Sequence, residues 1–207
     1  CDRLIAFRKK IVKNKRKKYI DQIYWAKPIT GFGDINAKIL FVGLAPAAHG
    51  GTRTGRVFTG DKSSDFLYKC LYNAKISNQS KSEHVNDGLK LKDAYITAAL
   101  KCVPPEDKPI KSELYNCFKY FNTELILLKN LKIIVGLGKI AFDTCVEFYK
   151  KNYGIRGNYK FAHGKFFKLT NKIILVGCYH PSPRNVNTGR INERKMTNLF
   201  KRIKKIY

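Results

Sequence analysis

Acidic residues are scarce in this sequence. Its 207 residues include 15 Asp and Glu against 41 Lys and Arg, which gives a formal net charge of +26 at pH 7. This excess is far larger than solubility requires. It favours a polyanionic partner, because Lys and Arg that neutralise phosphates release counterions. Nucleic acid is therefore the predicted partner, and an anionic membrane surface or a merely lysine-rich composition are the alternatives.

Long apolar runs are also lacking. No stretch approaches the ~20 residues of a membrane-spanning helix, and the first residues, CDRLIAFRKK, have too short an apolar core for a secretory signal. Six cysteines without an export signal indicate a reduced, intracellular setting rather than a disulfide framework. We expect a cytoplasmic, nucleoid-associated protein in which some thiols are candidate metal ligands.

The apolar residues that are present predict an α/β fold. Four short and nearly continuous apolar runs are typical of strands buried on both faces of a parallel sheet; they lie at 39–43, 95–100, 132–137 and 172–178. Helical patterns occupy 63–73, 111–128, 139–150 and 192–206. This alternation predicts a single domain over 1–207, a three-layer α/β/α sandwich with a central four-stranded parallel sheet and a helical N-terminal part at 1–37. The polar stretch at 76–93 is expected to be a surface loop.

Each predicted strand ends in an unusual loop. The four loops read GLAPAAHGG, KCVPPEDKP, GLGKIA and GCYHPSPRN. In open α/β sheets, ligands bind outside the carboxyl ends of the strands, so we expect these loops to form one cleft. The small residues of the first loop let a flat ligand approach backbone amides. This loop lacks the lysine and hydroxyl residue of a P-loop and the glycine spacing of a dinucleotide site. We therefore expect it to hold a base rather than a phosphate.

His180 directly follows the last predicted strand. It is fixed between a buried strand and a proline, so it is a candidate functional group. The alternative is a structural role, which is commoner for a lone histidine. The prolines and the arginine that follow would suit insertion into a DNA groove, where a rigid wedge helps to unstack a base.

Two long motifs resemble the uracil-DNA glycosylase superfamily, and specifically its family 5 (B-type) enzymes. They are GLAPAAHGGTRTGRVFTGD at 43–61 and HPSPRNVNTGR at 180–190. The segments YWAKPITGFGD at 24–34 and KCVPPEDKP at 101–109 are similar to that family as well. The resemblance covers almost the whole chain. It implies a monomeric, monofunctional DNA glycosylase of base excision repair, which flips a damaged base from DNA and hydrolyses its N-glycosidic bond.

The resemblance also implies roles for individual residues. Phe58 would stack on the flipped base, and His180 would form a hydrogen bond with the departing base. The expected substrate pocket comprises Gly43, Leu44, Ala45, Ala47, His49, Phe58 and Ala98. The expected DNA-binding residues are Arg53, Arg56, Pro181, Ser182, Pro183, Arg184, Asn185 and Arg190.

Asp61 is the expected catalytic carboxylate. In most of the superfamily an Asp or Asn of the first loop activates the water, but Ala47 and Ala48 occupy that stretch here. Asp61 is the nearest carboxylate and matches the acid of FTGD in family 5. It would act as a base or as the electrostatic partner of an oxocarbenium-like sugar. The alternative is that Asp61 caps the helix expected near Ser63, although the serines there could also cap.

Ala98 departs from the pattern of related families, which carry an Asn at this place on the second strand to read uracil. Losing a bidentate amide contact worth roughly 1–3 kcal/mol should weaken discrimination. We therefore expect activity on uracil and on deaminated purines such as hypoxanthine or xanthine. The alternative function is a catalytically weak nucleic-acid-binding protein that keeps the glycosylase fold.

Three cysteines are expected to bind a metal cluster. On sequence alone they are a weak signal, and Zn²⁺ rivals an iron–sulfur centre. The resemblance implies a [4Fe–4S] cluster with Cys1, Cys102 and Cys117 as ligands and a fourth cysteine upstream of residue 1. The remaining cysteines, Cys70, Cys145 and Cys178, are most simply small buried hydrophobic residues.

Overall fold

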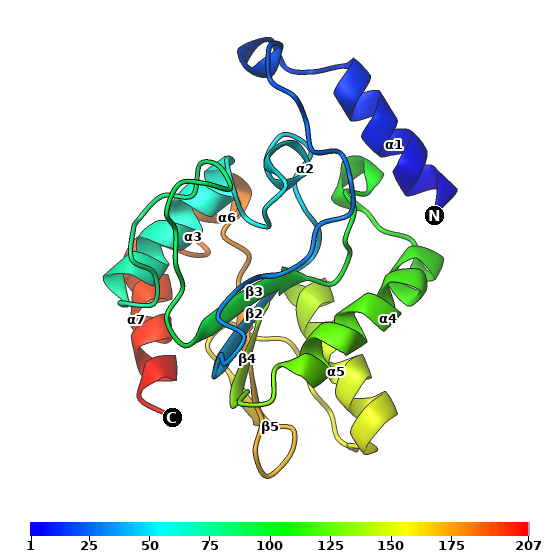
Figure 1. Cartoon of the computed structure of the whole chain (residues 1–207). Coiled ribbons are helices and arrows are strands. Elements are labelled where there is room, and N and C mark those ends of the chain that lie inside the picture. Colours follow the sequence, from blue (N-terminus) through cyan, green and yellow to red (C-terminus); the bar gives the residue numbers. More distant parts are fainter. Residues whose placement is uncertain (207) are drawn as a thin grey trace.

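A six-stranded sheet forms the centre of the protein, in a computed structural model that describes residues 1–206 (Figure 1). The strand order is β1-β3-β2-β4-β6-β5. The four inner strands are parallel: β2 (Ile39–Gly43), β3 (Ala94–Ala98), β4 (Ile133–Leu137) and β6 (Ile174–Cys178). The predicted four-stranded parallel sheet is therefore confirmed. The sequence did not predict the antiparallel edge strands β1 (Phe32–Gly33) and β5 (Phe166–Lys168), which are too short to carry a pattern.

Helices cover both faces of this sheet (Figure 1). On one face lie α3 (Lys62–Asn73) and α7 (Glu193–Lys204), and on the other lie α4 (Lys111–Leu127) and α5 (Lys139–Tyr153). The predicted three-layer α/β/α sandwich is confirmed. Alternate side chains of β2 enter the two cores: Ile39 and Phe41 join the cluster under α3 and α7, and Leu40 and Val42 join the other. Because both faces are buried, the strand is apolar throughout.

The helix boundaries follow local capping signals. Asp61 and Asn192 cap the starts of α3 and α7 with their side chains. The end of α5 lies three residues beyond the prediction, where Gly154 adopts a left-handed backbone with φ 62°. The sequence GLGKIA, which lacks the third glycine of a dinucleotide site, is the β4–α5 turn with Gly138 at the helix N-cap.

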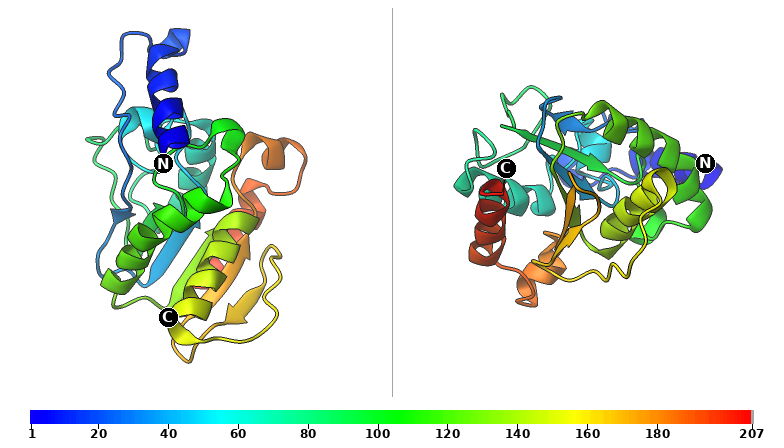
Figure 2. Two further views of the ribbon diagram at one scale, coloured as in Figure 1. Left: turned by 90° about the vertical axis from the view of Figure 1, so that its right-hand side faces the viewer. Right: turned by 90° about the horizontal axis from the view of Figure 1, so that it is seen from below.

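The N-terminal segment projects from one end of the molecule. It consists of α1 (Asp2–Lys13) and the 3-10 helix η1 (Lys17–Tyr19), and both lie beyond the carboxyl ends of the parallel strands (Figure 2). Leu4 of α1 packs with Leu100, Cys102 and Cys117, and Ile11 packs in a neighbouring cluster. Three short helices follow strand ends at the same end of the molecule: α2 (Gly51–Thr54), η2 (Pro105–Asp107) and α6 (Pro183–Asn187).

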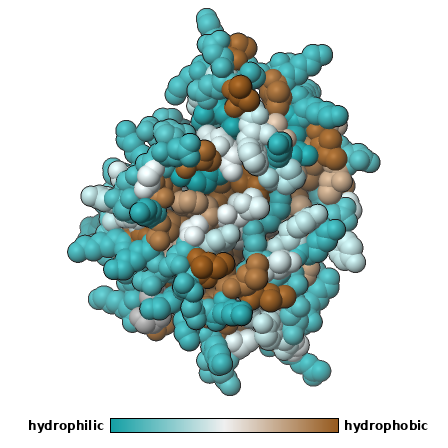
Figure 3. All heavy atoms as spheres, in the orientation of Figure 1, coloured by the Kyte–Doolittle hydropathy of each residue, from teal (hydrophilic) through white to brown (hydrophobic). Residues whose placement is uncertain are grey.

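The face of the molecule seen in the orientation of Figure 1 is mostly hydrophilic. Hydrophilic side chains dominate the face shown in Figure 3, and apolar groups form smaller areas among them. Within residues 1–206, no helix is both long and apolar enough to cross a membrane.

Candidate active site at the carboxyl ends of the strands

The strand-end loops are contiguous. Main-chain hydrogen bonds join the β2 and β3 loops, from Ala99 N to Gly43 O at 2.9 Å and from Leu100 N to Leu44 O at 2.9 Å. Another joins the β4 and β6 ends, from Gly138 N to Cys178 O at 2.8 Å. The Phe58 and His180 rings connect the two halves, with centroids 6.0 Å apart. The loops predicted to share one site therefore do lie against one another.

The first loop uses its carbonyl groups internally and leaves amide groups free. Ala47 O accepts hydrogen bonds from Gly50 N and Thr52 N, at 3.3 and 3.1 Å. In contrast, no hydrogen bond within residues 1–206 uses the N–H groups of Ala45, Ala47 or Ala48. All three alanines are half-buried. The loop thus offers a row of unpaired donors, which is what a ligand rich in carbonyl oxygens requires.

Phe58 lies against the backbone of Gly43. Its φ of 48° is in the left-handed region, which is rare and strained for an aromatic residue. A Cβ at position 43 would lie 2.6 Å from Phe58 Cε2, so only glycine leaves room for the ring. The side chain is 8% exposed. Phe58 therefore has one fixed position beside His180, and base stacking by this ring stays a prediction.

Asp61 is the N-cap of α3. Its Oδ1 accepts hydrogen bonds from Ser63 N at 2.9 Å and Ser64 N at 3.0 Å, and Ser64 Oγ accepts from Asp61 N at 3.0 Å. The capping alternative is confirmed. The expectation that a serine could cap in its place is wrong, because Ser64 completes the capping box from inside the helix. A catalytic role is not tested by this contact.

The second oxygen of Asp61 remains free for another role. No hydrogen bond within residues 1–206 involves Oδ2, and a Cβ on Gly50 would lie 2.0 Å from it. Oδ2 therefore lies over the first loop. Burial raises the pKa of Asp61, against the opposing effect of the N–H donors of Ser64 and Ser63. A carboxylate with a raised pKa is a stronger base than an exposed one.

His180 is held as a neutral imidazole. Burial lowers its pKa to about 4, so it carries no charge at pH 7 and can donate one hydrogen bond. Asn185 Nδ2 donates to His180 O at 2.9 Å, and Asn185 N donates to Ser182 Oγ at 3.4 Å. Ser182 and Asn185 were predicted to bind DNA, and here they position the main chain of His180.

His49 and Arg53 brace the first loop. Tyr24 Oη lies 2.8 Å from His49 Nδ1. Burial, together with the charges of Arg16 and Arg53, lowers the pKa of His49. Arg53 donates to His49 O at 2.7 Å and to Gly60 O at 3.0 Å. Its side chain therefore connects the first loop to the residue that precedes Asp61. Contact of these residues with substrate or DNA stays a prediction.

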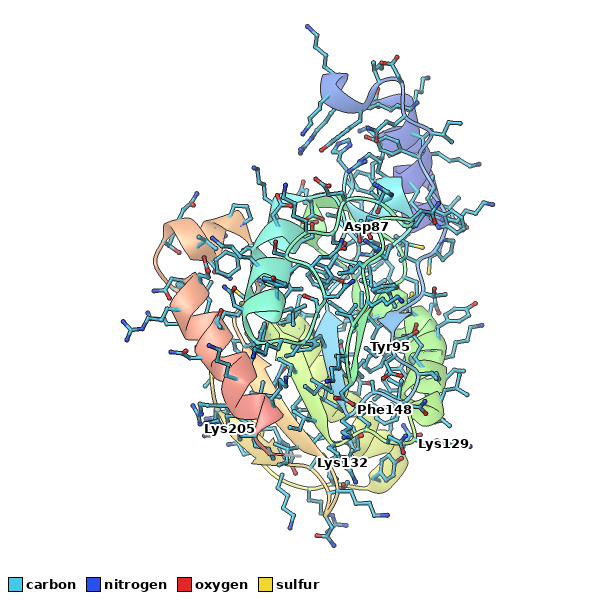
Figure 4. The ribbon with its side chains drawn as sticks, turned by 60° about the vertical axis from the view of Figure 1, so that its left-hand side comes forward. Asp87, Tyr95, Lys129, Lys132, Phe148 and Lys205 are labelled. Carbon is cyan, nitrogen blue, oxygen red and sulfur yellow. The ribbon has the colours of Figure 1, made fainter. Side chains whose placement is uncertain are left out.

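Arg56 is buried, and its predicted DNA contact is wrong. Its side chain is 5% exposed and forms an ion pair with Asp87, Nη2 to Oδ2 at 2.6 Å. It also donates to Thr59 Oγ1 and to Ser82 Oγ, both at 2.9 Å. Asp87 lies near α2, at the end of the molecule opposite Lys132 and Lys205 (Figure 4). The polar stretch 76–93 is thus anchored in the protein beside Phe58.

The loop after β6 is only partly available to DNA. Pro181 is buried, so its predicted insertion into the duplex is wrong. Ser182 caps the short helix α6, and Pro183 occupies its first turn. Pro183, Arg184 and Arg190 are exposed, and their contact with DNA stays a prediction.

Comparison with known proteins assigns the family. The family model described as "Uracil DNA glycosylase superfamily" matches residues 30–204. The chain belongs to the uracil-DNA glycosylase superfamily. A "Type-5 uracil-DNA glycosylase" of Thermus thermophilus is 39% identical over 207 residues, covering 100% of this chain and 92% of the relative. Those of Mycobacterium tuberculosis and Pyrobaculum aerophilum are 38% and 37% identical, covering 100% and 98% of this chain and 76% and 85% of the relatives. The predicted resemblance is confirmed.

A largely buried ion pair joins the loop after β3 to α4, and the sequence did not predict it. Lys101 Nζ donates to Glu124 Oε2 at 2.6 Å, Thr97 Oγ1 at 2.8 Å and Ala98 O at 3.0 Å. Ala98 is 4% exposed and lies beside Gly43 in the strand register. Through its hydrogen bond to Ala98 O, Lys101 fixes the backbone at the end of β3.

The three predicted ligand cysteines share one cavity. It measures about 1120 Å³, and its lining includes Cys1, Cys102 and Cys117. Leu4 and Leu100 pack beside Cys102 and Cys117 and shield one side. Within residues 1–206, no group of three His, Cys, Asp or Glu side chains could hold a metal ion. The three cysteines nevertheless share a space large enough for a cluster whose irons each take one thiolate, and both the iron–sulfur cluster and the rival zinc ion stay predictions. Cys70, Cys145 and Cys178 are fully buried, as predicted.

Proposed function

We propose that this protein is a monofunctional glycosylase of base excision repair, which removes uracil from DNA by hydrolysis. The observation that carries the proposal is the identity of 37–39% to type-5 uracil-DNA glycosylases over nearly the whole chain. The unpaired amides of the first loop, the Phe58–His180 pair and the free oxygen of Asp61 supply the chemistry. The net charge of +26 would attract the phosphates of DNA, and the free thiols suit a reducing environment such as that around the nucleoid. We expect the protein to act as a monomer, as the resemblance implies.

Each step of the reaction has a candidate group. The base would flip into the first loop, where the N–H groups of Ala45, Ala47 and Ala48 would bind its carbonyl oxygens. As the glycosidic bond breaks, negative charge moves onto the base. The neutral His180 would donate a hydrogen bond to it, in a buried setting where such bonds are strong. Asp61 Oδ2 would either take a proton from the attacking water or stabilise the cationic sugar.

The substrate range should include deaminated purines. The methyl group of Ala98 offers no hydrogen bond to the base edge, so nothing at this position favours uracil over a larger base with a similar carbonyl pattern. In a panel of duplexes with uracil, hypoxanthine, xanthine or mismatched thymine, we expect release of uracil and of at least one deaminated purine. Release of uracil alone would contradict the broad range. Tight, salt-sensitive binding without any release would instead support the noncatalytic alternative.

We also propose that Cys1, Cys102 and Cys117 are ligands of a [4Fe–4S] cluster. Their shared cavity supports this proposal, and the lining supplies three thiols, so a fourth ligand is needed from elsewhere. Such a cluster would hold α1 against the β3 loop. Full-length protein prepared without oxygen should contain about four irons per chain. Cys117→Ala should lose most of that iron, whereas Cys145→Ala, buried in the core under α5 and absent from the cavity lining, should retain it. Equal iron content in both variants would contradict the assignment.

A further inference from the structure

Residues 13–27 form a tip that exposes large apolar side chains. Ile23 is 96% exposed, Ile20 56% and Trp25 47%. The tip includes η1 and projects beyond α2 at the end of the molecule that carries the strand-end loops (Figures 1 and 2). Apolar groups clustered at an exposed tip are characteristic of an interaction surface.

The tip is attached firmly to the active-site loop. Trp25 N donates to Arg53 O at 2.9 Å, and the Arg53 guanidinium lies 4.1 Å from the centre of the Tyr19 ring. The same guanidinium donates to Gln22 Oε1 at 2.7 Å and to Gly60 O at 3.0 Å. Because Gly60 precedes Asp61, one side chain connects the tip to the predicted catalytic segment. The tip is thus positioned relative to the flipped nucleotide.

Positive charge surrounds the apolar side chains. The exposed basic residues of the tip are Lys13, Arg16, Lys17, Lys18 and Lys27. Asp21 is the exposed acid of the same segment. Basic side chains around an apolar centre match duplex DNA, which offers phosphates on both sides of a groove lined by sugars and base edges. An apolar protein partner would leave these charges without counterparts.

We propose that this tip is a second DNA-contacting element, separate from the loop after β6. Its basic side chains bind phosphates of the duplex flanking the lesion, and Ile20, Ile23 and Trp25 lie against sugars and base edges in the groove. The proposal rests on the proposed function. It adds a contact site on the other side of the active-site loop from α6. Together the two elements grip the duplex on both sides of the flipped nucleotide.

The charge contribution can be tested with two matched double variants. Lys13→Gln/Lys17→Gln removes two charges from the tip, and Lys168→Gln/Lys172→Gln removes two exposed charges near the amino ends of the strands. The probe is a duplex with a tetrahydrofuran abasic-site analogue, titrated from 50 to 200 mM salt. The tip variant should bind at least about tenfold more weakly, with a salt slope lower by about 2. The control should stay within about twofold of wild type. Equal effects of the two variants would overturn the proposal.

The apolar contribution needs a separate pair. Ile23→Ser should weaken binding to the same probe several-fold with an unchanged salt slope, because it removes apolar contact and no charge. Ile126→Ser on α4, where Ile126 is 57% exposed, should bind like wild type. Wild-type affinity of Ile23→Ser would overturn the groove contact. A tip that served a protein partner would leave both DNA measurements unchanged.

A kinetic measurement separates this proposal from the proposed function. Under single-turnover conditions with saturating enzyme, the tip variants should release uracil at the wild-type rate, because Asp61 and His180 are untouched. Failure of wild-type protein to release uracil would refute the proposed function. The binding comparison on the abasic analogue would still decide the role of the tip.

Discussion

Asp61→Asn should slow single-turnover release of uracil by about 100-fold or more. The variant removes the charge and basicity of Oδ2 but keeps an oxygen that can cap α3, and Asn is as good an N-cap as Asp. Its melting temperature should therefore stay close to that of wild type. Since burial raises the pKa of Asp61, the wild-type rate should fall as the pH is lowered through that raised value. The residual rate of Asp61→Asn should lack this decline.

Two controls separate chemistry from structure. Asp61→Ala should also lose the cap, and with it about 1 kcal/mol of stability, yet it should be no more than slightly slower than Asp61→Asn. Gly50→Ala keeps the carboxylate, but its Cβ would collide with Oδ2 at 2.0 Å and displace it, so activity should fall. If Asp61→Asn releases uracil at the wild-type rate, the capping contact is the whole role of this residue.

Arg56→Met should destabilise the protein by about 3–5 kcal/mol, because it leaves the buried carboxylate of Asp87 without its ion-pair partner. Burial alone would raise the pKa of Asp87. Hydrogen bonds from Arg56, Glu83 N and Leu89 N outweigh burial and lower the pKa to about 2. Urea unfolding at pH 7 measures the change in free energy. The gap between wild type and variant should persist above about pH 4 and shrink toward pH 2, as Asp87 becomes protonated in both states.

The matched control is Lys69→Met, which breaks the exposed pair between Lys69 and Glu193. It should change stability little, because solvent screens such pairs. Asp87→Asn combined with Arg56→Met should cost less than the sum of the single changes, since both act on one contact. A loss no larger for Arg56→Met than for Lys69→Met would contradict the structural role of Arg56.

The Arg56 network also explains how Phe58 keeps its strained backbone. A left-handed conformation costs of order 1–3 kcal/mol unless neighbouring contacts hold it. Thr59 Oγ1 accepts from Arg56 and lies 2.7 Å from Ser82 Oγ, and Gly60 N donates to Ser82 O at 2.8 Å. Thr59 and Gly60, which follow Phe58, are thus held by Ser82 of the polar stretch 76–93. Loosening that stretch should let the ring move away from Gly43.

The layers of the fold were predictable from sequence because their causes are local. A strand buried on both faces must be apolar throughout, and residues 39–43 show this without any knowledge of their neighbours. The cap at Asp61 is equally local, since donor and acceptor lie within three residues. The edge strands β1 and β5 have two and three residues, and pairing with a neighbour rather than composition defines them.

The features that the sequence mispredicted or missed depend mostly on contacts between segments that are far apart in the chain. Arg56 in a glycine-rich motif has the sequence context of an exposed phosphate ligand, and its burial depends on Asp87, 31 residues away. Lys101 and Glu124 are 23 residues apart and form another such pair. Pro181 has the context of a surface wedge but is buried at the start of the loop that leads into α6. For the three cysteines, spacing gave only a weak signal, and the resemblance supplied the set that the structure places around one cavity.

Mass spectrometry of a duplex with a single uracil tests the central claim most directly. After incubation with the full-length protein, hydrolysis predicts free uracil and an uncut strand that has lost the mass of uracil and gained that of one water. An unchanged uracil-containing strand would contradict the claim that this site cleaves the glycosidic bond. A strand cut without alkali would contradict its monofunctional character.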